Sequence, residues 1–416
     1  MTRAFAIDSA ASLPGRLITA GARLVAGGGV RAATARAVAD AAGASPSAIN
    51  YSFGSRSGLI HAVFEQAQAD AAARARRSLG DLDGLALRPE MLGDWLAAWL
   101  HCEAVEARDL IRLRRELFIQ TERLPELVEI ARAWRRVQRG FARGVLDRFG
   151  LADRPEAPLD EAMRAFADCF PAQAAPAAHS AWAGSAMRHL AARLAGLPPP
   201  PSGWREVIEA RAAARAPVVH ALPEPAERIL DGAIRLLARV GGGALSHRAL
   251  ARESGVSLAA TTHYFDSRAA ILRAAFERLY MKLSAQAQTL APDEGALTIK
   301  DFAAGLAEAS VGPGGAINTD IAAFDELLAT ACRDPALEPL ATHLIAARGA
   351  TAAAALSRMT GAAEPGAMRE DAFALSLMGI AAIADLRLTP PQHRIGEART
   401  LAELRLGVFM GPARPG

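Results

Sequence analysis

The sequence predicts an all-α protein made of two similar halves, and three observations support this. Long stretches rich in alanine, leucine, arginine and glutamate space apolar residues three and four apart, as at Trp95, Trp99 and Cys102. No stretch alternates apolar and polar residues for more than a few positions, as a half-buried strand would. The chain also repeats itself once, because residues 17–65 align with residues 229–277 without a gap.

This internal repeat defines the predicted domain organisation. Of the 49 aligned positions, 17 are identical, and eleven of these identities are not alanine. Two long copies do not make a solenoid, which needs about three or more short units. The repeat instead predicts duplication of a complete two-part protein, with halves at residues 13–221 and 222–416.

Each half is expected to open with a small head that is followed by a helical bundle. With 416 residues the chain has room for several cores, at roughly 150 residues per domain. The predicted ranges are 13–66 for the first head, 67–216 for the first bundle, 217–225 for a linker, 226–278 for the second head and 279–416 for the second bundle.

Composition excludes several classes of protein. With 51% hydrophobic and 22% charged residues, the chain is globular and not disordered. The apolar run at residues 372–384 is shorter than the about 20 residues that a membrane span needs, and the N-terminus lacks a secretory signal. Three widely spaced cysteines fit neither a disulfide framework nor a zinc site. We therefore expect a cytoplasmic protein with buried thiols, no metal, no cofactor and no membrane partner.

Glycines and capping residues mark the first two helices of the first repeat. Residues 17–26 form a helix that the run Gly27-Gly28-Gly29 ends. Thr34 can cap a second helix over residues 35–42, and Gly43 ends that helix.

A third helix follows after a short turn. Ser45 can cap it, Pro46 takes the first position, where a missing N–H does no harm, and the helix runs to Phe53. Two short helices joined by such a turn form the helix-turn-helix arrangement. On the third helix the inward residues are Ala48, Ile49, Ser52 and Phe53, and the outward ones are Ser47, Asn50 and Tyr51. The second copy has Ala260, Thr261, Tyr264 and Phe265 inward, and Ala259, Thr262 and His263 outward.

The chain resembles the tetracycline-repressor (TetR) family of bacterial transcription regulators at two segments, VADAAGASPSAINYSFGSRSGLIHAVFE and LARESGVSLAATTHYFDSRAAILRAAFE. Both have an Ala-x-x-x-Gly-x-Ser turn, a helix that ends in an aromatic residue or His before x-Phe, and a Ser-Arg step into a fourth helix. The resemblance covers the two heads and implies a nucleoid-associated regulator, most often a repressor, whose partner is double-stranded DNA. Two copies in one chain imply a fused version of a protein that normally works as a homodimer.

The chemistry expected of each head follows from DNA geometry. A helix fits the major groove, where short polar side chains reach base edges, while basic residues and backbone amides hold phosphates. The resemblance places Tyr51 and His263 at a position that contacts the DNA backbone, and it aligns Arg56 and Arg268 with a usual lysine of the fourth helix. The predicted DNA-binding residues are Thr34, Arg36, Ser45, Ser47, Asn50, Tyr51, Arg56, Ser246, Arg248, Ser257, Ala259, Thr262, His263 and Arg268.

Positive charge is concentrated in the two repeats. The net charge of only +3 excludes a basic coat over the whole surface. Both repeats carry more arginines than acidic residues. Their combined net charge exceeds the +3 of the whole chain, so the remainder of the chain is net negative. Arg36 and Arg248 lie on the exposed side of the second helix and are phosphate or base candidates, although an exposed arginine is most often only solvated.

The two predicted reading faces differ at every position. Two recognition helices with different outward side chains would bind different half-sites, so we predict an asymmetric operator or an imperfect palindrome. Thr261 stands where the first copy has Ile49, and its hydroxyl is expected to loosen the second head. Two alternatives stay open: a decayed second head that leaves a one-headed DNA binder, and a scaffold that keeps the fold without binding DNA.

The resemblance also implies a regulatory domain behind each head and a four-helix interface between two such domains. Candidate interface segments are residues 160–195 with 202–216, and residues 368–387 with 394–410. Because the linker makes this pairing intramolecular, we expect a monomeric chain that acts as a pseudo-dimer.

A small-molecule effector of unknown identity is the second partner that the resemblance implies. Aromatic residues could line its pocket, although aromatics at helical spacing are more often plain core. The candidates are Trp95, Trp99, Phe118 and Trp134 in the first half and Phe302, Phe324 and Phe373 in the second, with Cys102, Phe141, Cys332, His343 and Met378 as further options.

An enzyme is a remote alternative. The sequence has no HExxH, no Gly-x-Ser-x-Gly and no Gly-x-x-x-x-Gly-Lys motif. The glycine runs of the two repeats follow predicted helices and not strands, so they are poor phosphate cradles. We therefore expect no catalytic residues.

Overall fold

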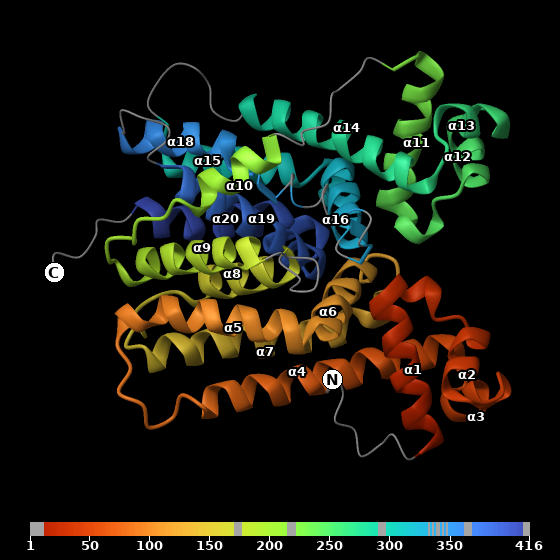
Figure 1. Ribbon diagram of the computed structural model, residues 1–416, viewed down its shortest axis with the longest axis horizontal. Helices are drawn as coiled ribbons and strands as arrows, with labels where there is room; N and C mark the ends of the chain where they lie inside the picture. Colours follow the sequence, from red (N-terminus) through yellow and green to blue (C-terminus); the bar gives the residue numbers. More distant parts are fainter. Residues whose placement is uncertain are drawn as a thin grey trace.

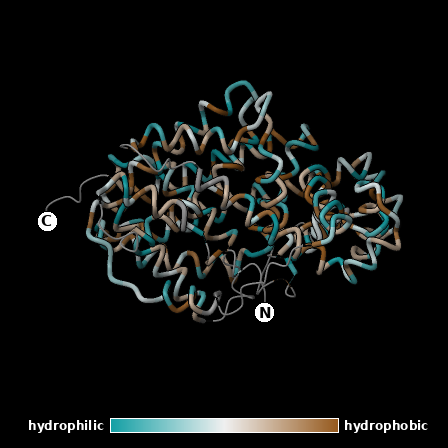
Figure 2. Tube along the Cα trace, turned by 90° about the horizontal axis from the view of Figure 1, so that it is seen from above, coloured by the Kyte–Doolittle hydropathy of each residue, from teal (hydrophilic) through white to brown (hydrophobic). Residues whose placement is uncertain are grey.

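The computed structural model describes residues 12–169, 177–213, 222–289, 297–331, 333–334, 337, 342, 345–346, 348–361 and 368–410. Within these residues the regular elements are helices, and the one β-type contact is an isolated bridge between Val311 and Ile317. The predicted all-α class is confirmed. Along individual helices the hydropathy of the chain alternates, as expected of amphipathic helices that bury one side (Figure 2).

The two heads lie at the same end of the molecule, one above the other in Figure 1. The first head consists of α1 (Leu13–Gly28), α2 (Ala35–Ala42), α3 (Ser47–Phe53) and the start of α4 (Arg56–Gly80). The second consists of α11 (Glu224–Val240), α12 (His247–Ser254), α13 (Leu258–Tyr264) and the start of α14 (Arg268–Thr289).

The first helix begins earlier than predicted. The side chain of Ser12 accepts a hydrogen bond from the Gly15 N–H at 3.2 Å, and Pro14 occupies the first turn, where no donor is needed. The apolar spacing at residues 17–26 therefore marks the buried part of α1 and not its full length. Its end, at Gly29, agrees with the predicted glycine run.

The predicted cap of the second helix, Thr34, is confirmed, and the equivalent Ser246 caps the second helix of the second head. The Thr34 hydroxyl accepts a hydrogen bond from the Ala37 N–H at 3.1 Å, and Gly43 ends α2 in the left-handed conformation. In the second head Ser246 accepts from the Ala249 N–H at 3.2 Å in the same way.

The predicted cap of the third helix, Ser45, is wrong, although the equivalent serine of the second head does cap its helix. Ser45 makes no capping bond from its side chain, because its hydroxyl lies 2.8 Å from the Ser47 hydroxyl and its carbonyl accepts the first N–H of the turn. Helix α3 therefore begins after Pro46. The side chain of Ser257 does cap α13, accepting from the Ala260 N–H at 3.0 Å.

Behind each head lies a helical body. The first body contains α5 (Leu92–Glu106), α6 (Arg108–Gln120), α7 (Val128–Arg148), α8 (Glu156–Cys169), α9 (Ala177–Ala195) and α10 (Trp204–Ala213). The second contains α15 (Ile299–Ser310), α16 (Thr319–Ala331), α18 (Ala350–Thr360), α19 (Arg369–Leu388) and α20 (Arg394–Met410). Equivalent packing recurs in both halves: α1 packs on α6 as α11 packs on α16, and α5 packs on α9 as α15 packs on α20. The two halves thus repeat the same internal packing.

One continuous helix joins each head to its body. The domain boundaries placed at residues 66 and 278 fall inside α4 and α14. The core of the first head also includes apolar side chains from the body, among them Leu113 of α6 and Trp134 of α7. A head can therefore move relative to its body only with the helices that carry it. Of the predicted linker, residues 217–221 lie outside the described residues.

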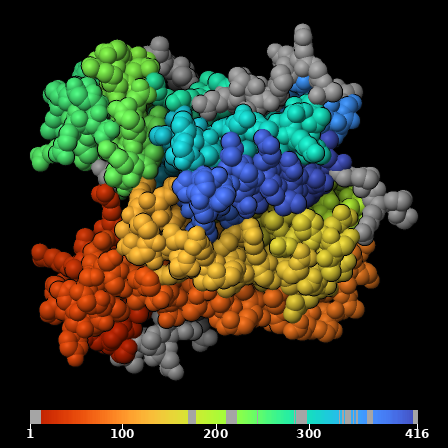
Figure 3. Space-filling view, turned by 180° about the vertical axis from the view of Figure 1, so that it is seen from behind, coloured from red at the N-terminus to blue at the C-terminus, as the bar shows by residue number. Residues whose placement is uncertain are grey.

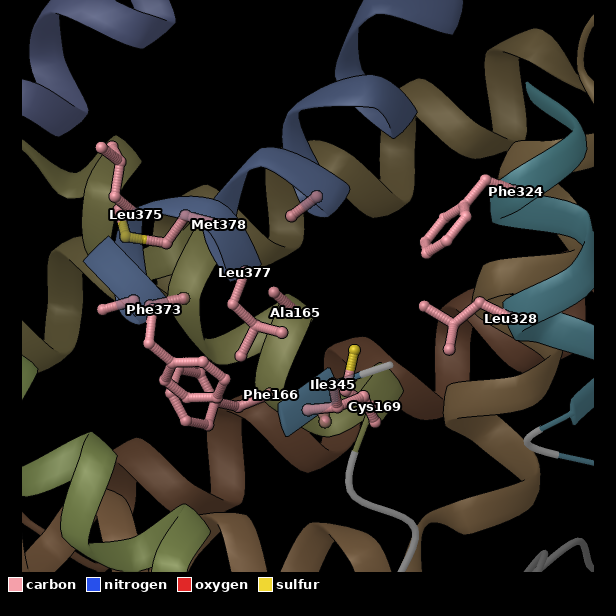
Figure 4. Close-up of a cluster of buried hydrophobic side chains, with 14 of the residues drawn as sticks. Ala165, Phe166, Cys169, Phe324, Leu328, Ile345, Phe373, Leu375, Leu377 and Met378 are labelled. Carbon is pink, nitrogen blue, oxygen red and sulfur yellow. The ribbon is translucent and has the colours of Figure 1, made fainter. Parts of the chain in front are cut away.

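The segments expected to pair the halves pack against each other, since α8 and α9 contact α19 and α20. Figure 3 shows the blue C-terminal helices lying against the yellow helices of the first half. At the centre Phe166 of α8 meets Phe373 of α19 edge to face, with ring centroids 6.2 Å apart (Figure 4). Helix α10 packs on α9 and reaches the second half, where the Arg205 guanidinium lies 4.8 Å from the Phe373 ring centre.

Two remaining expectations concern cysteines and membranes. Cys169 is buried as predicted, but Cys102 is exposed on α5, and Cys332 lies outside the described residues. The buried side of α5 carries Leu96, Leu100 and Ala104, and Cys102 lies off this side. Over the described residues, none of the helices is apolar for long enough to cross a membrane.

Candidate nucleic-acid interface

The outward face of α3 has the predicted composition and is open to solvent. Ser47, Asn50 and Tyr51 are exposed, and Tyr51 has 90% of its surface accessible. Ile49 on the opposite face is fully buried and anchors the helix to the head. A tyrosine held this far out of the core gains little from packing, so its position is consistent with contact to a partner.

The outward face of α13 is also exposed, with Ala259, Thr262 and His263 on it. The buried Thr261 donates its hydroxyl to the Leu258 carbonyl oxygen at 2.8 Å, so this polar group is satisfied inside the helix. The Thr261 hydroxyl was expected to loosen the second head. Because it is hydrogen-bonded, it gives no reason for such loosening. The ring of His263 stands edge-on to that of Tyr264, with centroids 5.0 Å apart.

The arginines of the second helix extend into solvent. Arg36 and Arg248 are both exposed, and the Arg36 guanidinium lies 3.8 Å from the Asp40 carboxylate one turn later. An exposed ion pair of this kind contributes at most about 1 kcal/mol, so a phosphate can displace it at little cost. The structure leaves both arginines where the predicted DNA contact needs them.

The arginines that open the fourth helix have an additional role within the head. Arg56 donates its Nε–H to the Ala33 carbonyl at 2.8 Å and also bonds the Val30 carbonyl. Arg268 donates to the Gly242 carbonyl at 2.9 Å, at the position equivalent to Val30. Each guanidinium therefore holds the loop between the first two helices. Because a guanidinium has five donors, a contact with phosphate remains compatible with this role and stays a prediction.

A cavity of about 80 Å³ lies behind the first head, between α4, α5, α6, α7 and α8. Two expected pocket residues, Trp99 and Trp134, line it together with Phe141. Polar groups that were not expected share the lining, among them Arg74, Glu103, Arg114, Gln138, Asp160 and Arg164. The chain has so many arginines that nothing in the sequence distinguished the arginines of this lining from solvated ones.

Ion pairs fix the charged side chains of this cavity. Arg74 pairs with Glu103, and Arg164 lies 3.0 Å from Asp160. Burial opposes ionisation of Asp160, but the guanidinium groups of Arg135 and Arg164 hold its pKa below the usual range. Both signs of charge are therefore present in the wall of this cavity.

The other expected pocket residues have different surroundings. Trp95 stacks on Trp99 with centroids 6.5 Å apart, and Phe118 lines a smaller cavity of about 20 Å³. Phe302, Phe324 and Phe373 are buried in the hydrophobic core that includes side chains of both halves. His343, like Cys332, lies outside the described residues.

A second cleft, of about 350 Å³, lies at the end of the molecule remote from the heads. It separates the end of α9 from α20 and is lined by Arg193, Leu197, Thr400, Glu403 and Leu404, among others. This cleft is open and lies between the halves, whereas the aromatic cavity lies within the first half.

Comparison with known families agrees with the geometry of the heads. Residues 17–63 and 229–275 each match the model of the family of bacterial regulatory proteins called the tetR family. No protein with a curated description matches the chain. The two matched ranges cover α1 to α3 with the start of α4, and α11 to α13 with the start of α14. The chain is therefore a DNA-binding transcription regulator of the tetR family that carries two helix-turn-helix heads in tandem.

Proposed function

We propose that this regulator is a ligand-responsive repressor that binds an asymmetric or imperfectly palindromic operator through both heads at once. The observation that carries the proposal is the pair of exposed and unlike reading faces, Asn50 and Tyr51 on one head against Thr262 and His263 on the other. Both faces belong to heads at one end of the same chain (Figure 1). Identical heads would read identical half-sites, whereas these two present different hydrogen-bonding groups to DNA.

The linkage of the halves favours binding as a single chain. The helices that would pair two subunits already pack against each other within the chain. Because the two heads are covalently joined, binding of the second head to its half-site is intramolecular and occurs at a raised effective concentration. We therefore propose a monomeric pseudo-dimer, with repression as its action because members of this family mostly repress.

The proposed ligand response depends on the cavity between α4, α5, α6, α7 and α8 and on the connection of this cavity to the head. Three consecutive residues of α6 contact the cavity, the other half and the head. Arg114 lines the cavity, Arg115 donates to the Asp325 carboxylate at 2.9 Å, and the Glu116 carboxylate accepts from the Val30 N–H at 2.9 Å. A ligand that moves α6 would therefore shift a head away from the spacing of successive major grooves.

The chemistry of the wall favours a ligand with an aromatic ring and a negative group. Trp99, Trp134 and Phe141 provide ring faces, and an anionic group of the ligand would replace Glu103 on Arg74 or Asp168 on Arg114. The cavity is smaller than the roughly 300–1,000 Å³ typical of ligand pockets, so a ligand of ordinary size has to part these helices.

The test is DNA binding by the full chain, first with its own upstream intergenic DNA and then with a genome-wide selection of fragments, followed by footprinting. Tyr51→Ala and His263→Ala each remove one exposed side chain that is predicted to contact DNA. Leu85→Ala, which removes another exposed side chain, is the control. Each reader variant should weaken binding by roughly 5- to 100-fold and remove protection from a different half-site, without affecting the other.

Other outcomes would support the alternatives. If only Tyr51→Ala weakens binding, the second head is a passive partner. If no fragment binds specifically even at low salt, the chain is a scaffold that keeps the fold. Two identical protected half-sites would contradict the asymmetric operator.

A further inference from the structure

Both heads are attached to their bodies by the same contact between a backbone N–H and a buried carboxylate. The Val30 N–H donates to Glu116 Oε1 at 2.9 Å, and the Gly242 N–H donates to Glu326 Oε1 at 3.0 Å. Val30 and Gly242 are equivalent positions of the repeat, and the two glutamates occupy equivalent places on α6 and α16. Glu116 is 2% exposed and Glu326 is 5% exposed.

The glycine before each N–H is required by this contact. Gly29 and Gly241 have φ of +75° and +86°, a conformation that residues with a side chain rarely adopt. A Cβ at Gly29 would lie 3.0 Å from Glu116 Oε1, and one at Gly241 would lie 2.8 Å from Glu326 Oε1. The attachment is therefore built into both copies of the repeat.

The second oxygen of each carboxylate is bound by an arginine of the opposite half. Arg333 Nη2 lies 2.6 Å from Glu116 Oε2, and Arg123 Nη1 lies 3.4 Å from Glu326 Oε2. Each arginine follows the glutamate of its own half by seven residues, so the two crossed pairs are equivalent when the halves are exchanged. The contact that holds one head thus includes a side chain from the other half.

Arg123 makes further contacts with the opposite head. It donates to the carbonyl oxygens of Leu237, Ala238 and Arg239 at 3.2, 3.1 and 3.2 Å. These carbonyls belong to the last turn of α11, at the negative end of its dipole, and the Leu237 oxygen also accepts from the Gly241 N–H at 3.0 Å. A guanidinium encoded in the first half therefore caps the first helix of the second head.

We propose that Arg123 and Arg333 are crossed positioning residues, each of which holds the DNA-binding head of the opposite half in the orientation needed for reading DNA. The crossing makes the spacing of the two heads a property of the assembled pair, because neither head keeps its full attachment unless the other half is docked. This inference rests on the proposed function only for its DNA-binding consequence.

The experiment compares Arg123→Ala and Arg333→Ala in the full chain by hydrogen exchange of backbone amides without DNA. Arg123→Ala should speed exchange in residues 229–275 by about tenfold or more and leave residues 17–63 unchanged. Arg333→Ala should do the reverse, with a smaller effect, because no carbonyl cap of α1 by Arg333 is among the described contacts. Arg123→Lys keeps the charge near Glu326 and should recover part of the protection.

Arg143→Ala is the matched control, because Arg143 also bonds carbonyl oxygens and a carboxylate. Its partners are the carbonyls of Ala152 and Arg154, both at 3.0 Å, and Glu156, all in its own half and away from the heads. This variant should leave exchange in both heads unchanged. A general loss of stability would speed exchange in both heads and would contradict the proposal, as would a change in the head of the same half or in neither head.

Footprinting provides the second arm. Arg123→Ala should lose the half-site that His263→Ala loses, and Arg333→Ala should lose the half-site that Tyr51→Ala loses. If each variant speeds exchange in the head of the opposite half but no specific DNA site is found, the proposed function is wrong and the positioning role stands. If one variant fails to fold, the other decides, because its effect must still fall on the opposite head.

Discussion

A cluster of buried charged residues joins α7 and α8 of the first half to α19 of the second. Arg164 of α8 donates to the Asp385 carboxylate of α19 at 2.9 Å, and Arg135 of α7 donates to the same carboxylate at 2.8 Å. Arg164 also bonds Asp160, and all four side chains are buried. In a low-dielectric interior such a cluster is stable only while every charge has its partner.

Removal of Asp385 should therefore be costly. Asp385→Ala leaves two buried guanidinium groups without a shared carboxylate, and we expect the free energy of unfolding to fall by about 3–5 kcal/mol. Denaturant unfolding of the full chain measures this. The control is Asp83→Ala, since Asp83 pairs with Arg148 at 2.7 Å on the surface and should cost less than about 1 kcal/mol. Equal effects of the two changes would contradict the argument.

Glu161 should make the stability of the chain depend on pH. Burial raises the pKa of Glu161 to about 7, although Arg405 lies 3.2 Å away and opposes the shift. Since this value exceeds 4.5, the folded chain binds the proton more tightly than the unfolded chain. The stabilisation is complete below pH 4.5 and is lost as the pH rises through about 7.

Glu161→Gln, which mimics the protonated carboxyl, tests this dependence. Between pH 5 and 8 the free energy of unfolding of the natural chain should fall relative to that of the variant by up to about 3 kcal/mol. Unfolding curves at a series of pH values measure the difference. A constant difference across this range would show that Glu161 is ionised throughout.

At the scale of single elements, the two recognition helices end differently. Helix α3 includes Phe53, whereas the equivalent Phe265 is extended and follows the end of α13. The start of the next helix offers a reason. A Cβ at Gly58 would lie 2.2 Å from the Phe53 carbonyl oxygen, and the second head has Ala270 at this position. Only glycine allows the recognition helix of the first head to approach α4 so closely.

Gly58→Ala should displace the end of α3. Because the new Cβ cannot stand 2.2 Å from the backbone oxygen of Phe53, the helix has to shift, and with it Tyr51. We expect roughly tenfold weaker operator binding, with protection lost from the half-site of the first head only. Gly80→Ala at the end of α4, where a Cβ meets nothing within 4 Å, is the control and should have no effect. Unchanged binding by Gly58→Ala would show that α3 tolerates the shift.

At the scale of the whole molecule, the surface that would pair two subunits is already covered. Trp182 of α9 and Phe373 of α19 are almost completely buried, with ring centroids 5.0 Å apart. We therefore expect a single chain of 43.6 kDa in solution and one chain per operator. Sedimentation analysis of the free protein and of its DNA complex measures both. A stable dimer of chains on one pair of half-sites would contradict the intramolecular pairing.

Local patterns in the sequence were sufficient for the heads. The repeat, the cap at Thr34 and the 3.6-residue period of the recognition helices predicted which side chains face outward, because these features depend on neighbours within a few residues. The error at Ser45 arose from a local competition, in which the backbone carbonyl took the N–H that its side chain was expected to bind. The all-α class followed from the same short-range rules.

The connections between distant residues were decided only by the tertiary structure. Arg115 meets Asp325, and Arg333 meets Glu116, across more than 200 positions of the chain. Among 47 basic residues, nothing local distinguishes an arginine that binds a buried carboxylate from one that is solvated. The sequence by itself determined two heads and their reading faces, because helix formation and capping are short-range. Only the packing of the two halves determined how each head is held, because a buried charge takes its partner from whichever helix folds against it.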